Sequence, residues 1–192
     1  MANKVQKNKK VLRKVKKKWF KVVTPDYLNS IELGEISAYE PASLPGRTIC
    51  IPLKELTGSP RDSMSKIKLR ITEVRGETCS VEPEELSVQN AQVGRSDRRA
   101  KEKIITMVDE TTKDKQKIRI KIYILLNNKV IRAVRTAIDS TTRNFVSNYI
   151  NKREAKDVFV TSTPKNIANK LKDELKKIYP AHVIVWKIKK MK

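Results

Sequence analysis

Apolar and polar residues alternate along three segments of the chain, at residues 66–74, 116–126 and 182–191. Successive side chains of a strand point to opposite faces, so this period of two predicts strands with one buried face. Residues 103–116 read as another strand followed by a polar turn, which predicts a hairpin over residues 103–126. The segment 182–191 begins apolar on both faces and ends basic on one. The cations on the polar faces of these strands are Lys66, Lys68, Arg70, Lys117, Arg119, Lys121, Lys187 and Lys189.

Two further strands are predicted to be short. Residues 19–23 are mostly aromatic or β-branched, and the turn signal Thr24-Pro25-Asp26 ends them. Residues 47–53 read as the second short strand, followed by a helical turn over residues 53–56. Gly58-Ser59-Pro60 then breaks the chain.

A helical period predicts a helix from Val130 to about Arg153. Its expected apolar stripe is Ile131, Val134, Ile138, Phe145 and Tyr149. Three arginines fall roughly on the opposite side: Arg132, Arg135 and Arg143.

A second helix is predicted to begin at Thr163, a good N-cap residue, with Pro164 at the first helical position. Its expected buried stripe is Ile167, Leu171, Leu175 and Ile178. Tyr179-Pro180 ends it, because proline cannot continue a helix.

The order of elements is mostly strands, then two helices, then a strand, which predicts an α+β fold. We expect a mostly antiparallel, barrel-like sheet core with two packed amphipathic helices. Residues 1–18 are expected to be a disordered basic arm that binds RNA, and residues 19–192 a single α+β domain.

The charge of the chain points to a polyanionic partner. Lysine and arginine number 43 against 21 acidic residues, which gives a net charge of +22. The arm holds many of these cations, yet the rest of the chain is also strongly basic. The cations of the arm are Lys4, Lys7, Lys9, Lys10, Arg13, Lys14, Lys16, Lys17 and Lys18.

The stretch VLRKVKKKWFKVV at residues 11–23 allows a competing interpretation, a membrane-surface helix with a basic face. The Thr24-Pro25 stop leaves that helix barely three turns and a narrow apolar stripe. Elsewhere, no run approaches the roughly 18 apolar residues of a spanning helix, and the N-terminus lacks the apolar core of a signal peptide. We therefore favour an arm that ends in a strand, in a cytosolic protein.

No catalytic or metal-binding constellation is evident in the sequence. Cys50, Cys79 and His182 cannot form a four-ligand zinc site, and a disulfide is not expected. The glycines are isolated, so no phosphate-binding loop is present. Three glutamates, Glu82, Glu84 and Glu85, are expected in a solvated loop or the first turn of a helix. We expect no enzyme and no cofactor; an RNA-modifying enzyme using His182 or Asp139 is the alternative.

The remaining candidate for a functional feature is the basic surface. Ordinary solvated faces mix charges of both signs, whereas these faces are consistently positive. Structured RNA, bound through its backbone and shape, fits this pattern better than a single strand, since aromatic residues do not cluster. Trp19, Phe20 and Trp186 are expected to anchor the core. Besides the arm, the candidate RNA-binding residues are Lys66, Lys68, Arg70, Arg95, Arg98, Arg99, Lys101, Lys103, Arg132, Arg135, Arg143, Lys187, Lys189 and Lys190.

Four stretches resemble, in this order, the archaeal and eukaryotic small-subunit ribosomal proteins of the three-A-e family. They are KKKWFKVVTP, GRTICIPLKEL, KIKLRITEVRGETC and IYPAHVIVWKIKKMK, of which the last is the most specific. The resemblance covers residues 17–192 and is weakest over 84–100. The chain stops soon after the last strand, without the long extension of eukaryotic members, which favours the archaeal type.

The resemblance implies a non-enzymatic protein on the platform of the small subunit, near the messenger exit and the 3′ end of the ribosomal RNA. Implied partners are that RNA, neighbouring small-subunit proteins and messenger RNA near the exit, with no membrane and no homo-oligomer. The implied location is the cytoplasm, in the small ribosomal subunit. An RNA-binding or RNA-modification accessory protein outside the ribosome is the alternative.

Overall fold

The computed structural model describes residues 16–191, so most of the predicted arm lies outside the described residues. The chain divides into two compact units. The first runs to Ile49 and includes Leu69–Glu82; the second comprises Cys50–Lys68 and Pro83–Lys192. The single domain expected over residues 19–192 stays a prediction. The candidate arm cations outside the described part are Lys4, Lys7, Lys9, Lys10, Arg13 and Lys14.

In the first unit, the predicted strand at residues 19–23 is the core of β1 (Lys18–Val23). It pairs antiparallel with β2 (Glu32–Ala38) and parallel with the first residues of β5 (Thr78–Val88). The parallel pairing makes the sheet mixed. Short 3₁₀ turns, Asp26–Leu28 and Pro41–Ser43, connect the strands of this unit.

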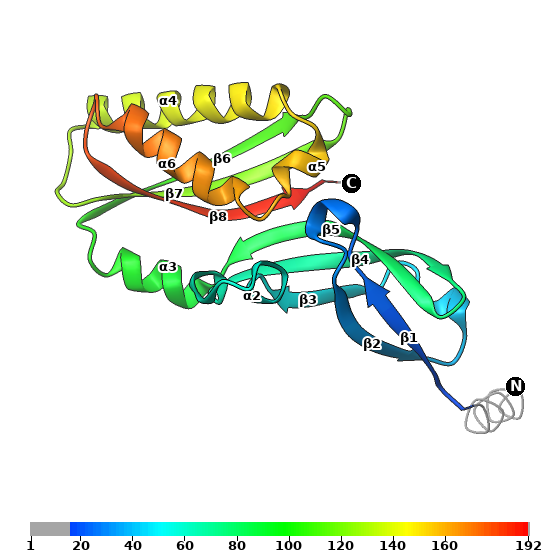
Figure 1. The fold of residues 1–192 in the computed structure, drawn as a ribbon. Helices are drawn as coiled ribbons and strands as arrows, with labels where there is room; N and C mark the ends of the chain where they lie inside the picture. Colours follow the sequence, from blue (N-terminus) through cyan, green and yellow to red (C-terminus); the bar gives the residue numbers. More distant parts are fainter. Residues whose placement is uncertain (1–15, 192) are drawn as a thin grey trace, which may run out of the picture. The chain divides into compact units, whose positions relative to one another are not determined.

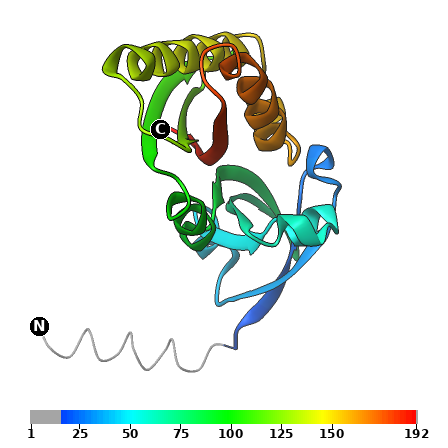
Figure 2. The ribbon, with the colours of Figure 1, turned by 90° about the vertical axis from the view of Figure 1, so that its left-hand side faces the viewer.

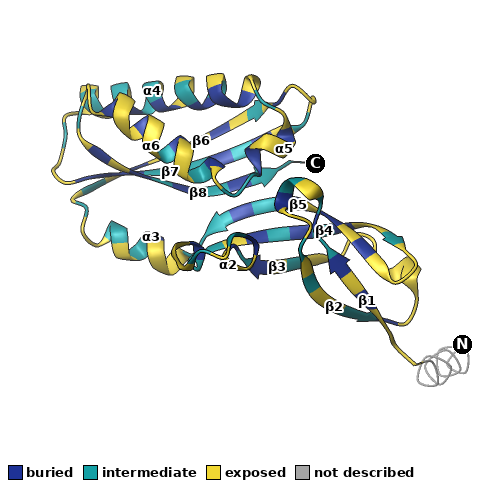
Figure 3. Cartoon of the chain, in the orientation of Figure 1, coloured by how far each residue is buried: buried dark blue, intermediate teal, exposed yellow. Residues whose placement is uncertain are grey.

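Three strands and the end of β5 form an antiparallel sheet in the second unit, in the order β6-β7-β8-β5. They are β6 (Glu102–Thr111), β7 (Lys117–Leu126) and β8 (Ala181–Lys190), shown in Figure 1. The hairpin predicted over residues 103–126 is confirmed by the pairing of β6 with β7. Buried and exposed residues alternate along β6, as Figure 3 shows.

Two helices cover one face of this sheet (Figures 1 and 2). Helix α4 (Arg132–Asn151) contacts β6, and α6 (Thr163–Leu175) contacts β8. The even-numbered residues of β7, Ile118 to Leu126, are fully buried, which places the core between sheet and helices. The odd-numbered residues before Leu125 face away from that core and are partly or fully exposed.

The remaining elements are two more strands, short helices and a 3₁₀ turn. Strands β3 (Thr48–Pro52) and β4 (Ser65–Arg75) each supply residues to both units. The second unit also contains α2, α3, α5 and a 3₁₀ turn, which are Lys54–Thr57, Asn90–Asp97, Ala155–Val158 and Pro60–Asp62. The break predicted at Gly58 is confirmed, since this residue caps α2 with a φ of 67°.

Strand β8 contains an irregularity that explains its unusual pattern. Val185 pairs with Ile122 and Lys187 with Lys121, so Trp186 is an extra residue between them. Such a bulge shifts the alternation by one position. The buried residues are therefore Val183 and Val185 before the bulge and Ile188 after it.

Several predictions about individual positions are wrong. Trp19 is not a core anchor, because 63% of it is exposed; Phe20 beside it is buried. Ile131 precedes α4 and is 77% exposed, and the buried stripe continues instead through Thr142 and Val146. Trp19 is exposed because neighbouring residues of a strand point to opposite faces, and Phe20 takes the inward position of β1.

Two further corrections concern element boundaries. The N-cap of α6 is Ser162 rather than Thr163, whose hydroxyl donates a hydrogen bond to the carbonyl of Asp157 (2.8 Å). The helix ends at Leu175, which leaves Ile178 exposed. The glutamates Glu82, Glu84 and Glu85 lie in β5 rather than in a loop or helix, because strand pairing overrides their weak strand preference.

Candidate nucleic-acid interface

Cations from neighbouring strands come together on the face of the β6-β7-β8-β5 sheet that α4 and α6 leave open. Lys187 pairs with Lys121, and Lys189 pairs with Arg119, so these four side chains share one face. Lys66 joins them, because it lines an open hollow of about 480 Å³ together with Lys187. We call these five residues the sheet cations.

Two of the sheet cations are already paired with carboxylates. Arg119 donates to both carboxylate oxygens of Asp109 at 2.7 and 2.6 Å, and this hydrogen bonding lowers the pKa of Asp109. Lys187 lies 2.7 Å from Glu85. Within the described part of the chain, the other three sheet cations make no ion pair.

The arginines of α4 are bound to the edge strand β6 instead. Arg143 donates to Asp139 at 2.9 Å and to the carbonyl of Met107 at 3.3 Å, and Arg135 lies 3.8 Å from Glu102. Burial favours the neutral carboxyl of Asp139. The hydrogen bonds from Thr106 and Arg143 outweigh this, so its pKa is lowered. These arginines therefore hold α4 onto the sheet.

The other predicted cations lie outside this group of five. Lys16, Lys17 and Lys18 are exposed at the start of β1, with Lys17 5.4 Å from the ring centroid of Tyr39. Lys103 pairs with Asp97 at 3.0 Å. Exposed along or near α3 and α4 are Arg95, Arg98, Arg99, Lys101 and Arg132. Half-buried in strands are Lys68, Arg70 and Lys190.

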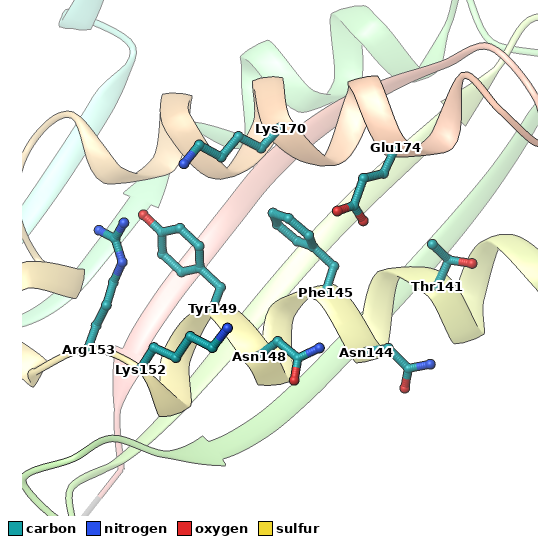
Figure 4. Close-up of a pocket in the computed structure, with 9 residues that line it drawn as sticks. All are labelled: Thr141, Asn144, Phe145, Asn148, Tyr149, Lys152, Arg153, Lys170 and Glu174. Atoms are coloured by element: carbon teal, nitrogen blue, oxygen red, sulfur yellow. The ribbon is translucent and has the colours of Figure 1, made fainter.

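A groove between α4 and α6 contains cations that the sequence prediction missed (Figure 4). Its volume is about 590 Å³, and Lys152, Arg153 and Lys170 line it. The rings of Phe145 and Tyr149 point from α4 toward α6 and stack with centroids 6.1 Å apart. The four-residue spacing of Phe145 and Tyr149 was the signal in the sequence for this groove, because it places two side chains on the same face of a helix.

Tyr149 is the most constrained side chain of this groove. The guanidinium of Arg153 lies 4.1 Å from its ring centroid, an ordinary cation–π distance. Its hydroxyl is buried and has no hydrogen-bond partner among residues 16–191. Burial raises the pKa of Tyr149.

The residues considered for catalysis are not assembled into a site. His182 is exposed on β8, and its pKa is lowered by partial burial and by the charge of Lys172. Asp139 is engaged by Thr106 and Arg143, and both cysteines are free. In the described region, no three His, Cys, Asp or Glu residues gather as a metal site would require. None of its helices is long and apolar enough to cross a bilayer.

Comparison with known proteins gives consistent matches. The sequence model of the Ribosomal S3Ae family matches residues 5–192. A protein of Nanoarchaeum equitans called small ribosomal subunit protein eS1 is 29% identical over 173 residues, covering 90% of this chain and 87% of its own. Proteins with the same name from Picrophilus torridus and Halorubrum lacusprofundi are each 27% identical over 164 residues; the alignments cover 85% of this chain and 78% and 76% of theirs.

Proposed function

Because this chain belongs to the Ribosomal S3Ae family, we propose that it is a structural, non-enzymatic component of the small ribosomal subunit that binds ribosomal RNA. The observation that carries the proposal is the extent of the match, which runs from residue 5 to residue 192. Proteins called small ribosomal subunit protein eS1 match most of the chain. The protein would accordingly work in the cytoplasm, within ribosomes.

The charge distribution supports RNA as the direct partner. Lys66, Lys121 and Lys189 lie on one open sheet face and have no ion pair within the described chain. Each phosphate that such a cation neutralises releases a counterion, which makes binding strong at low salt and weak at high salt. We expect the arm and the remaining exposed cations to add to this salt-dependent binding.

Finer features belong to the same proposal. We place the protein on the platform, near the messenger exit and the 3′ end of the ribosomal RNA, beside neighbouring small-subunit proteins and the messenger path. Its core is expected to be barrel-like, with two packed amphipathic helices. These positions follow from the family resemblance.

Sedimentation of the tagged full chain through a sucrose gradient tests the proposal. We expect the protein to sediment with small subunits and to be released only at high salt. Recovery solely in the free soluble fraction, or in RNA complexes smaller than the subunit, would favour an RNA-binding role outside the ribosome.

A charge-matched pair of variants tests whether the sheet cations contribute. Lys66→Glu/Lys189→Glu should lower recovery with small subunits. The control, Lys54→Glu/Lys177→Glu, changes the charge equally at two exposed positions off this face and should sediment normally. Equal loss in both variants would mean that net charge alone decides binding.

A further inference from the structure

An apolar zone interrupts the sheet cations on the open face of the second unit. Ile105 and Met107 on β6 are 48% and 50% exposed. Ile105 pairs with Tyr123, and Tyr123 pairs with Ile184, so the three form a row across β6, β7 and β8. Tyr123 and Ile184 are half-buried, so the exposed side chains of Ile105 and Met107 border a partly open apolar row. Exposed apolar side chains that gather in this way mark an interaction surface.

Two aromatic rings from the central strands are fixed within this zone. The rings of Tyr123 and Trp186 pack edge to face, with centroids 5.1 Å apart and planes at 87°. The Nε1 of Trp186 donates a hydrogen bond to the Oδ1 of Asn90 at 3.2 Å. The Nζ of Lys121 lies 5.5 Å from the centroid of the Trp186 ring. Trp186 follows Ile184 by two positions and so lies on the same face of β8, and the bulge places Lys187 on that face as well.

Among the described residues, the charged groups near the zone that remain unpaired are cations. Three carboxylates nearby each have a cation partner: Asp109 has Arg119, Glu85 has Lys187, and Asp97 has Lys103. Lys121 and Lys189 have no such partner in the described chain. A matching ligand therefore presents acceptors and flat apolar groups together, which is the chemistry of unpaired nucleotides.

We propose that this open face, centred on Tyr123, binds an unpaired segment of RNA. Bases lie on Tyr123 and the neighbouring Ile105, Met107 and Ile184, while phosphates contact Lys121 and Lys189. This inference rests on the proposed function and deepens it, because the contacts considered so far involve only the RNA backbone. A protein segment is the competing occupant, but it would not bring the phosphate charge that the unpaired Lys121 and Lys189 favour.

Binding of fluorescent dodecauridine to the purified full chain tests the inference, with an RNA duplex of the same length as comparison. Tyr123→Leu keeps an apolar side chain but removes the ring. It should weaken dodecauridine binding roughly five- to one-hundred-fold, the usual loss for one stacked base, with an unchanged salt slope. Duplex binding should change much less. Lys121→Gln should instead lower the salt slope by about 0.7, the contribution of one phosphate of a single strand.

Tyr179→Leu is the matched control, because it removes a half-buried ring of the same unit away from this face. It should bind dodecauridine like the wild type, and urea unfolding should show that both leucine variants are folded. Wild-type affinity in Tyr123→Leu would overturn the inference. The double variant Ile105→Ser/Met107→Ser distinguishes a protein occupant. If it no longer sedimented with small subunits but still bound dodecauridine, this face would bind a protein and not RNA. Binding of ribosomal RNA without binding of dodecauridine would leave the proposed function intact and remove this inference alone.

Discussion

The arginines of α4 and the lysines of the open sheet face look alike in the sequence, but the structure gives them different surroundings. Arg135 and Arg143 reach carboxylates and a carbonyl on or beside the edge strand β6. Lys66 and Lys189 have no ion pair with any described residue. The comparison indicates that a count of exposed cations overstates how many are free to bind a polyanion, because some cations already serve the fold.

The arginine side of this comparison has a structural reason. An edge strand exposes unpaired backbone groups, and β6 is the edge of its sheet. Arg143 donates a hydrogen bond to the carbonyl of Met107, and Thr106 donates one to Asp139 at 2.7 Å. These contacts both attach α4 and protect the edge, so we expect them to affect stability more than RNA affinity.

The largest effect on stability is expected when the carboxylate of Asp139, which Thr106 and Arg143 both contact, is removed. Asp139→Ala leaves the fully buried hydroxyl of Thr106 without its acceptor, and should lower the free energy of unfolding by about 2 kcal/mol. The folded pKa of Asp139 is below its ordinary value, so its contribution is complete at neutral pH. The part of that contribution that depends on the charge of Asp139 should be lost as the pH falls below about 4. Urea unfolding of both proteins across pH measures this, and a stability difference that stays the same size in acid would contradict it.

A crossed pair of double variants should separate the two groups of cations. Lys66→Ala/Lys189→Ala should reduce the salt slope of RNA affinity by about 1.5, at ~0.7 to 0.9 per phosphate contact, with stability unchanged. Arg135→Ala/Arg143→Ala should do the opposite, lowering the free energy of unfolding by about 1 kcal/mol with little change in slope. Filter binding over a range of salt and urea unfolding provide the two measurements. Equal slopes in the two variants would remove the distinction.

The smallest effect is expected at Asp109, the carboxylate that holds Arg119. Its side chain is 52% exposed, so Asp109→Asn should change the free energy of unfolding by less than about 1 kcal/mol. Freeing Arg119 should raise RNA affinity about twofold at low salt, an effect that salt screens. Weaker binding in this variant would show that Arg119 needs Asp109 to be positioned.

The strands with clear alternation were predictable because one face of each meets an apolar core. Ile67, Leu69 and Ile71 are buried in β4, as are the even-numbered residues of β7. Strand β2 was not predicted, since its residues are mostly exposed and Gly34 adopts a φ of 128°. Strand β5 contains Pro83 and three glutamates, and its pairing partners rather than its composition make it a strand.

The sequence by itself determined the α+β class, the long hairpin and the strongly basic character, because periodicity and charge are local properties of the chain. The tertiary structure decided which cations are free and which hold α4 to β6, since partners on β6 such as Met107 for Arg143 lie more than thirty residues away. It also decided that Tyr123 and Trp186 meet, because the register of β7 with β8 brings them together. Pairing across strands depends on register, and register is set by the packed core rather than by any one segment.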